Sequence, residues 1–256
     1  RQGFGVEHAL GEHDFAGGQM ADLGIAAWPL SGCALEKPLL QTLPEQQGFK
    51  PAPRLAAGFE PLPANLALLR LELPLPRRGF VDAEYHHVAM STGTIPIPCG
   101  EALEGIDLQA RILHALQLDG TQRVLEIGTG TGYSASVMSR LAKRVNTMER
   151  YRTLHASAVQ RMRHLGLTNV IAEHADGSSG SDDGPFERVV CWAAFESTPR
   201  NFVEQLNSGG IMICAIGEAD QAQTLVRMSK VGSRFEREDI GTVRFQPIAH
   251  GLPSVL

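Results

Sequence analysis

One short stretch constrains the fold of this chain more than any other. The apolar residues Val124, Leu125 and Ile127 read as a buried parallel strand. Three glycines follow it at alternate positions, Gly128, Gly130 and Gly132. A helical pattern begins at Ser134. The glycines let the backbone approach a ligand, and the N-terminus of a helix offers unpaired N–H groups. A strand, a glycine turn and a helix in this order are typical of the first unit of a nucleotide-binding α/β fold.

The rest of the second half of the chain continues this alternation. A helical pattern over 107–116 precedes the first strand, and further helical patterns cover 152–165 and 201–206. Strands alternating with helices predict a doubly wound, mostly parallel sheet. Two final strand patterns have no long helix between them, which predicts an antiparallel edge strand. The remaining strand patterns lie at 144–149, 170–174, 186–193, 211–216, 223–230 and 240–245.

Proline density divides the 256 residues into two parts. Nine of the fifteen prolines lie in residues 1–80, where they interrupt any long helix. We expect residues 1–76 to form an irregular or partly helical N-terminal segment and residues 77–256 to form the α/β domain. An extended segment is expected over 95–101, because its prolines disfavour a helix there.

Charge and cysteine usage exclude several classes of function. The net charge is −5 and the pI is about 6.0, with no basic run of the kind that binds nucleic acid or a membrane surface. No apolar stretch approaches the roughly 20 residues of a membrane span. The four cysteines, at 33, 99, 191 and 214, are far apart and show no C-x-x-C spacing, so neither a metal site nor a disulfide framework is indicated. We expect a cytoplasmic protein with reduced thiols.

The glycine stretch indicates which cofactor it binds. A dinucleotide site requires G-x-G-x-x-G, but here the spacing is G-x-G-x-G and Tyr133 stands at the third glycine position. Glu126 precedes the turn, where a carboxylate repels a pyrophosphate but attracts an ammonium group. S-Adenosyl-L-methionine carries an ammonium and a sulfonium and no phosphate, so it is favoured over a nicotinamide. We expect contacts from Glu126, Tyr133 and the loop residues Gly128, Thr129, Gly130 and Gly132.

Two further acids follow later strands. Glu149 ends the second strand, 21 positions after Gly128, and this spacing suits acceptance from both hydroxyls of an adenosine ribose. Asp176 follows the third strand and suits an adenine amine, while Gly177 leaves room for the ring. We include Arg150 in this cofactor site. The simpler alternatives are a solvated acid paired with an arginine at Glu149, and an ordinary turn at Asp176.

An ordered set of motifs resembles the protein-L-isoaspartate O-methyltransferase family. The cofactor stretch at 124–133 is similar to the family's cofactor motif, and five other segments agree with family segments in order and spacing. These segments are Pro-Arg-Arg-Gly-Phe-Val at 76–81, Ile-Pro-Ile-Pro-Cys-Gly-Glu at 95–101, Ala-Asp-Gly-Ser-Ser-Gly at 175–180, Ala-Ala at 193–194 and Val-Arg-Phe-Gln-Pro-Ile at 243–248.

The resemblance implies a class I methyltransferase fold, which is Rossmann-like and has about seven strands. It also implies S-adenosyl-L-methionine as methyl donor and the α-carboxylate of L-isoaspartyl residues in damaged proteins as acceptor. The resulting ester collapses to a succinimide, and its hydrolysis returns some normal aspartate, so the reaction is a protein repair. The acceptor is ionised near neutral pH, so positioning matters more than a strong base. We expect a monomer whose partners are these damaged proteins.

The chain departs from the family pattern at two places. The family places a serine that contacts the reacting carboxylate where this chain has Glu104, so Glu104 is the candidate catalytic position. A carboxylate there would repel the acceptor unless it points away or is protonated. Residues 38–75 also read as an insertion relative to the family, or as a stretch in a shifted reading frame. A different acceptor, a nicotinamide-dependent oxidoreductase and a cofactor-binding relative without turnover are the alternatives.

Overall fold

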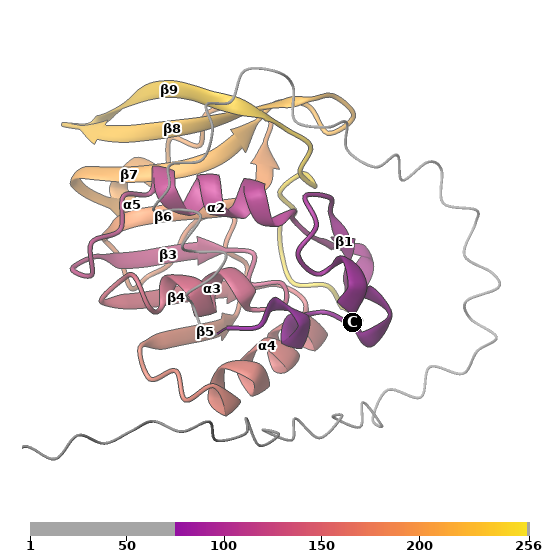
Figure 1. The fold of residues 1–256 in the computed structure, drawn as a ribbon. Helices are drawn as coiled ribbons and strands as arrows, with labels where there is room; N and C mark the ends of the chain where they lie inside the picture. Colours follow the sequence, from indigo (N-terminus) through magenta and orange to yellow (C-terminus); the bar gives the residue numbers. More distant parts are fainter. Residues whose placement is uncertain (1–74, 255–256) are drawn as a thin grey trace, which may run out of the picture. The chain divides into compact units, whose positions relative to one another are not determined.

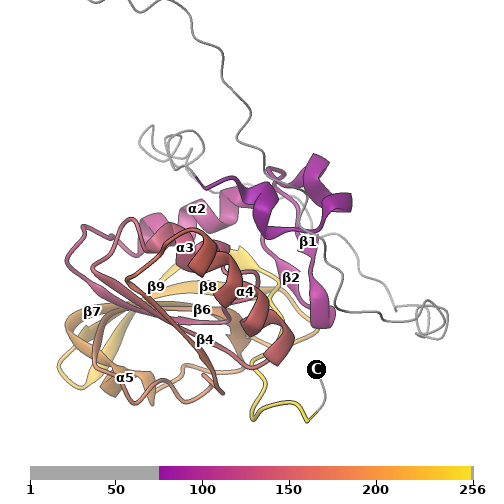
Figure 2. The same ribbon diagram turned by 90° about the horizontal axis from the view of Figure 1, so that it is seen from below.

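The computed structural model of the protein describes residues 75–254 (Figures 1 and 2). The chain divides into a unit of residues 1–49 and a unit of residues 50–256, and all described residues belong to the second. The predicted N-terminal segment 1–76 and the hypothetical insertion at 38–75 therefore lie almost entirely outside the described residues. The predicted boundary at 76/77 stays a prediction.

A seven-stranded sheet in the order β5-β4-β3-β6-β7-β8-β9 forms the centre of the described unit (Figure 1). The first five strands of the sheet in this order pair in parallel, whereas β7–β8 and β8–β9 pair antiparallel. The prediction of a mostly parallel sheet with an antiparallel edge is confirmed, and the antiparallel part comprises two strands. The strands are β3 Arg123–Ile127, β4 Arg144–Glu149, β5 Val170–His174, β6 Phe186–Phe195, β7 Leu206–Ile216, β8 Gln223–Val231 and β9 Arg234–Val243.

Helices cover both faces of this sheet. In Figure 2, α2 (Ile106–Ala115), α3 (Tyr133–Met138) and α4 (Arg152–His164) lie on one face, and the short α5 (Phe202–Gln205) lies on the other. Two hydrophobic clusters match this arrangement, because Val124 packs in the cluster with α2 and α3, and its neighbour Leu125 packs in the cluster with Phe202. Successive side chains of a strand point to opposite faces, so a strand buried on both faces needs a continuous apolar run.

The segment before α2 forms a small cap beside the sheet. It contains the 3₁₀ turns η2 (Arg77–Phe80) and η3 (Ala83–Val88), and a two-stranded hairpin of β1 (Ile95–Pro96) and β2 (Ala102–Leu103). The expectation of an extended segment over 95–101 is wrong in its middle, where η4 (Pro98–Gly100) forms a helical turn. A proline is tolerated at the first position of such a turn because its missing N–H would be unpaired there.

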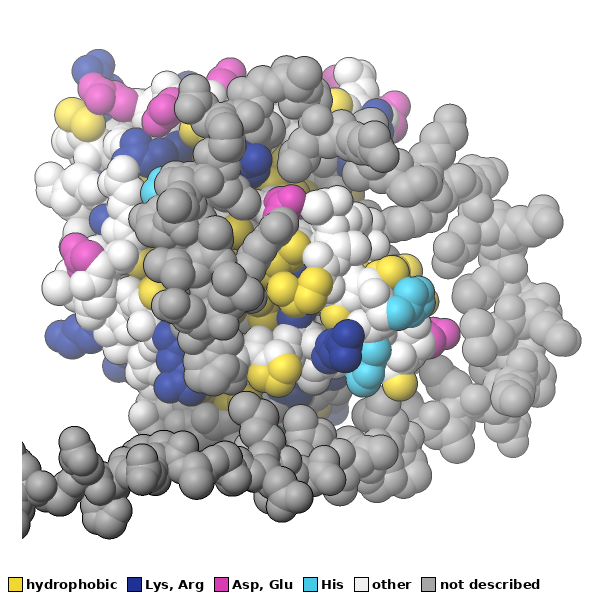
Figure 3. Space-filling model, viewed as in Figure 1, with side chains coloured by type: hydrophobic (Ala, Val, Ile, Leu, Met, Phe, Trp, Pro, Cys, Tyr) yellow, Lys and Arg dark blue, Asp and Glu magenta, His cyan; other side chains and the backbone are white. Residues whose placement is uncertain are grey.

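No helix within residues 75–254 is long and apolar enough to cross a membrane. The face drawn in Figure 3 carries acidic as well as basic side chains.

Candidate functional site

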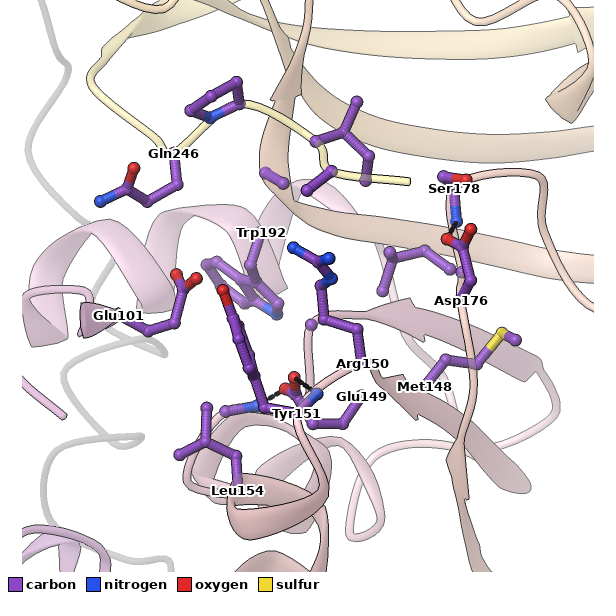
Figure 4. A pocket seen from close by; sticks show the side chains of 18 of the residues that line it. Glu101, Met148, Glu149, Arg150, Tyr151, Leu154, Asp176, Ser178, Trp192 and Gln246 are labelled. Atoms are coloured by element: carbon purple, nitrogen blue, oxygen red, sulfur yellow. Dashed lines mark hydrogen bonds between the residues drawn. The ribbon is translucent and has the colours of Figure 1, made fainter. Parts of the chain in front are cut away.

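A cleft opens at the carboxyl ends of β3, β4, β5 and β6, with an empty volume of about 710 Å³ that includes the part open to solvent (Figure 4). The strand order reverses beside β3, since β4 pairs on one of its sides and β6 on the other. Ligands of open α/β sheets bind at such a switch point. The hairpin of β1 and β2 and the C-terminal residues 246–249 contribute the remaining walls.

Of the residues predicted to bind a cofactor, six line this cleft and four do not. Those in the lining are Gly128, Gly130, Glu149, Arg150, Asp176 and Gly177. Those behind it are Glu126, Thr129, Gly132 and Tyr133. Direct contact between these four residues and a cofactor stays a prediction.

The glycine loop adopts a backbone that other residues rarely take. Gly128, Gly130 and Gly132 have φ of 92°, 53° and 84°. A Cβ on Gly132 would also lie 2.9 Å from the terminal methyl of Met162 and 3.1 Å from the Cβ of Ala158 on α4. Gly132 is therefore required where the loop packs on a helix, whereas Gly128 and Gly130 face the cleft.

Glu149 joins the glycine loop to the end of β4. Its Oε2 accepts a hydrogen bond from the N–H of Gly130 at 2.8 Å, and its Oε1 accepts one from the N–H of Tyr151 at 2.9 Å. The residue is 4% exposed and lines the cleft. A carboxylate has about four lone-pair sites, so two remain for a ligand. This geometry can receive a pair of hydroxyl groups.

Asp176 lies at the adjacent strand end and is bound to the C-terminal segment. Its Oδ1 accepts from the N–H of Ser178 at 2.8 Å, and its Oδ2 accepts from the N–H of Gly251 at 2.6 Å. Burial raises the pKa of Asp176, but the hydrogen bonds from Gly251 and Ser178 outweigh this effect, so the pKa is lowered overall. Gly177 fits closely against β3, because a Cβ there would lie 2.8 Å from the Cδ1 of Ile127.

Glu126 is entirely buried behind the cleft and accepts three hydrogen bonds. The donors are the hydroxyl of Ser134 at 2.5 Å, the hydroxyl of Thr147 at 2.7 Å and the indole N–H of Trp192 at 2.8 Å. Burial raises the pKa of Glu126 to about 7, although the three donors act in the opposite direction. Its carboxyl group therefore holds a helix, a strand and an aromatic side chain of the cleft wall together.

Thr129 and Tyr133 support the loop from the same hidden side. The hydroxyls of Thr129 and Thr147 lie 2.6 Å apart, and Thr129 is 2% exposed. Tyr133 packs edge-on against Phe80, with ring centroids 5.2 Å apart, and the guanidinium of Arg77 lies 5.1 Å from its ring centroid.

Glu104, the predicted catalytic position, does not line the cleft and lies close to the buried Arg77. The Nη2 of Arg77 donates a hydrogen bond to the backbone carbonyl of Glu104, and Arg77 is 2% exposed. Burial raises the pKa of the Glu104 carboxyl to about 7, and the nearby charge of Arg77 lowers it only in part. A catalytic role for Glu104 stays a prediction.

Several cleft residues were not predicted to act in the site. Glu101, Tyr151, Trp192 and Gln246 line it. Burial and the charge of Glu149 raise the pKa of Glu101. Glu101 and Gln246 lie inside motifs that the sequence does reveal, and Trp192 directly precedes one. Within residues 75–254, no group of His, Cys, Asp and Glu could hold a metal ion.

The sequence matches one family model and many known proteins. Residues 69–252 match the model of protein-L-isoaspartate(D-aspartate) O-methyltransferase. A relative of that name from Rhizobium meliloti (strain 1021) is 42% identical over 193 residues, which cover 75% of this chain and 95% of the relative. Another, from Azorhizobium caulinodans, is 40% identical over 193 residues and covers 75% and 89% of the two chains.

Solved structures agree with the fold. A protein-L-isoaspartate O-methyltransferase structure is 26% identical with a TM-score of 0.63, and the match covers 73% of this chain and 61% of that chain. A structure described as a putative enzyme of this type from Plasmodium falciparum, in complex with S-adenosyl-L-homocysteine, has a TM-score of 0.53 at 19% identity and covers 72% and 97% of the two chains. The chain belongs to the protein-L-isoaspartate(D-aspartate) O-methyltransferase family, whose members are S-adenosyl-L-methionine-dependent methyltransferases.

Proposed function

We propose that this protein transfers the methyl group of S-adenosyl-L-methionine to the α-carboxylate of L-isoaspartyl residues in damaged proteins. The position of Glu149 supports this proposal most directly. Its carboxylate ends β4 inside the cleft, is fixed by two backbone N–H groups and keeps free lone pairs for the two hydroxyls of a ribose.

The other cleft residues fit the same cofactor. Asp176 offers an acceptor for an adenine amine at the end of β5, and Met148 and Ile248 provide apolar surface for a ring. The carboxylates of Glu149 and Asp176 would repel a pyrophosphate, so this pair of acceptors suits a phosphate-free cofactor better than a dinucleotide.

The protein's part in the reaction is to bind the methyl donor and the acceptor and to orient them toward each other. The bound cofactor supplies an electrophilic methyl group on a sulfonium. The acceptor carboxylate is ionised at neutral pH and needs no general base, since an α-carboxyl group has a pKa of about 3.5. Glu149 and the glycine loop would fix the donor, while the hairpin and the C-terminal segment would exclude water and hold the acceptor in line.

A second candidate keeps the cofactor and changes the acceptor. Glu101 lies in the cleft lining, and Glu104 stands where the family has a serine that contacts the acceptor. If both carboxyl groups face the transferred methyl, they favour a neutral or cationic acceptor over a carboxylate whenever they are ionised.

Methyl transfer from radiolabelled donor separates these candidates. The full chain is incubated with an isoaspartyl peptide and, separately, with the peptide of the same sequence that carries a normal aspartyl residue. The radioactivity in base-labile methyl ester is then measured. Transfer to the isoaspartyl peptide alone supports the repair function. Donor binding without transfer to either peptide would rule out the repair function and leave the second candidate.

We also propose that the protein acts as a cytoplasmic monomer without nucleic acid. The net charge of −5 and the absence of a basic run support this proposal. Sedimentation equilibrium of the full chain tests it, because a dimer would double the mass of 27.7 kDa.

A further inference from the structure

We infer that Trp192, fixed by the buried carboxyl group of Glu126, gives the cleft added affinity for a sulfonium over its neutral thioether product. This inference rests on the proposed use of S-adenosyl-L-methionine, and it assigns Trp192 to the end of the cofactor where the methyl group is transferred.

The cleft has two chemically different ends (Figure 4). Asp176 and Ser178 lie at one end, and Arg150 and Glu149 occupy the middle. Trp192, Tyr151, Glu101 and Gln246 lie at the other end. If adenine lies at Asp176 and the ribose at Glu149, the sulfonium lies toward Trp192.

The ring of Trp192 is held in place from two sides. Its indole N–H donates to Oε1 of Glu126 at 2.8 Å, and its ring centroid lies 6.3 Å from that of Phe245. A Cβ added to Gly128 would lie 3.4 Å from the Cβ of Trp192, so the backbone of the glycine loop passes directly beside Trp192. The ring is therefore fixed in one orientation in the cleft wall, next to the loop that would hold the donor.

The charges at this end of the cleft match a cation. Glu101 lines this end and lies close enough to both Glu149 and Arg150 for their charges to interact. Among the described residues that line the cleft there is no lysine and a single arginine, Arg150, whose guanidinium lies 5.2 Å from the centroid of the Tyr151 ring. An aromatic face and a nearby carboxylate attract a cation and do little for a neutral thioether.

The two forms of the cofactor provide a direct test. S-Adenosyl-L-methionine carries the sulfonium, whereas S-adenosyl-L-homocysteine is neutral at sulfur and otherwise presents the same groups. A cation–π contact of ordinary strength contributes about a 2- to 30-fold difference in Kd. Removing the aromatic face should therefore weaken binding of the first compound and leave the second almost unchanged.

We would measure both dissociation constants by calorimetry on the full chain and on three variants. Trp192→Leu removes the ring, Trp192→Phe keeps an aromatic face without the N–H, and Met148→Leu is a matched apolar change at the other end. We expect Trp192→Leu to raise the Kd of S-adenosyl-L-methionine about 2- to 30-fold relative to that of S-adenosyl-L-homocysteine. Trp192→Phe should show a smaller relative loss, and Met148→Leu should change both constants equally.

Equal weakening of both compounds in Trp192→Leu and in Trp192→Phe would overturn the inference, because Trp192 would then only shape the cleft. If Trp192→Leu does not fold, Trp192→Phe decides alone. A ratio of the two constants that shifts against S-adenosyl-L-methionine supports the inference, and an unchanged ratio overturns it, because the hydrogen bond to Glu126 would then not matter for the sulfonium. If the unaltered chain binds neither compound, the proposed function itself is wrong.

Discussion

The N–H of Gly251 donates a 2.6 Å hydrogen bond to Oδ2 of Asp176, across 75 positions of sequence. The carbonyl of Gly251 accepts from Nε of Arg150 at 3.2 Å, and Nδ1 of His250 lies 2.9 Å from the hydroxyl of Ser178. Residues 246–248 are meanwhile paired with Ala194 at the end of β6. The C-terminal segment is thus attached at both ends and passes over the cleft.

Two truncations that differ by two residues test this attachment. A chain ending at Ala249 loses all three contacts of His250 and Gly251, whereas a chain ending at Gly251 keeps the groups that make them. We expect the shorter chain to bind S-adenosyl-L-methionine about 10- to 100-fold more weakly, since a hydrogen bond to a charged group contributes about 1.5–3 kcal/mol. Stopped-flow displacement should show that most of the loss is faster dissociation. Equal affinity of the two chains would mean that the segment does not act on the cofactor.

Glu149 should contribute more to cofactor affinity than any exposed acid. Glu149→Gln replaces one carboxylate oxygen by an N–H₂ group, which cannot accept from a backbone N–H or a ribose hydroxyl. We expect the Kd for S-adenosyl-L-methionine to rise about 10- to 100-fold, from the loss of about 1.5–3 kcal/mol. The exposed Glu196→Gln is the matched control and should leave the Kd unchanged. An unchanged Kd in Glu149→Gln would show that the ribose assignment is wrong.

The residues that sequence could place in the cleft are those that follow a strand directly. Glu149 and Asp176 each end or follow an apolar run, and the carboxyl ends of parallel strands meet at one edge of the sheet. Trp192 and Gly251 could not be assigned in this way. Trp192 depends on its partner Glu126, 66 positions away, and Gly251 acts through a backbone N–H that no side chain reveals.

The edges of the fold were harder to predict than its centre. The strand predicted at 240–245 is β9 Arg234–Val243, so it begins six residues earlier. Its residues 236–239 are charged and exposed, because an edge strand with solvent on both sides needs no apolar alternation. β3 is buried on both faces by contrast, and its bounds follow from its apolar run.

Glu104 should make methyl transfer to a carboxylate acceptor dependent on pH. Its carboxyl is neutral well below its pKa of about 7 and charged above it. If it faces the acceptor, kcat/KM for an isoaspartyl peptide should fall as the pH rises through about 7, because two carboxylates then repel each other. Glu104→Gln and the family-like Glu104→Ser should remove this fall and raise kcat/KM at pH 8. The measurement is initial rate against pH at saturating donor, and a wild-type profile that Glu104→Gln leaves unchanged would place Glu104 away from the acceptor.

The free energy of unfolding should fall as the pH rises, because the pKa of the buried Glu126 is raised in the folded protein. Its pKa is raised by burial from 4.5 in the unfolded chain to about 7 in the folded protein, so the folded state binds more protons between these values. The free energy of unfolding therefore falls as the pH rises from about 4.5 to about 7, by up to roughly 3 kcal/mol for this group. Glu126→Gln keeps an acceptor oxygen for Trp192 and Ser134 but carries no charge at any pH. Urea unfolding of both proteins between pH 5 and pH 8 should show a smaller fall in the variant, because the remaining fall then comes from other groups such as Glu104. Parallel curves for the two proteins would mean that the three hydrogen bonds to Glu126 keep it ionised throughout this range.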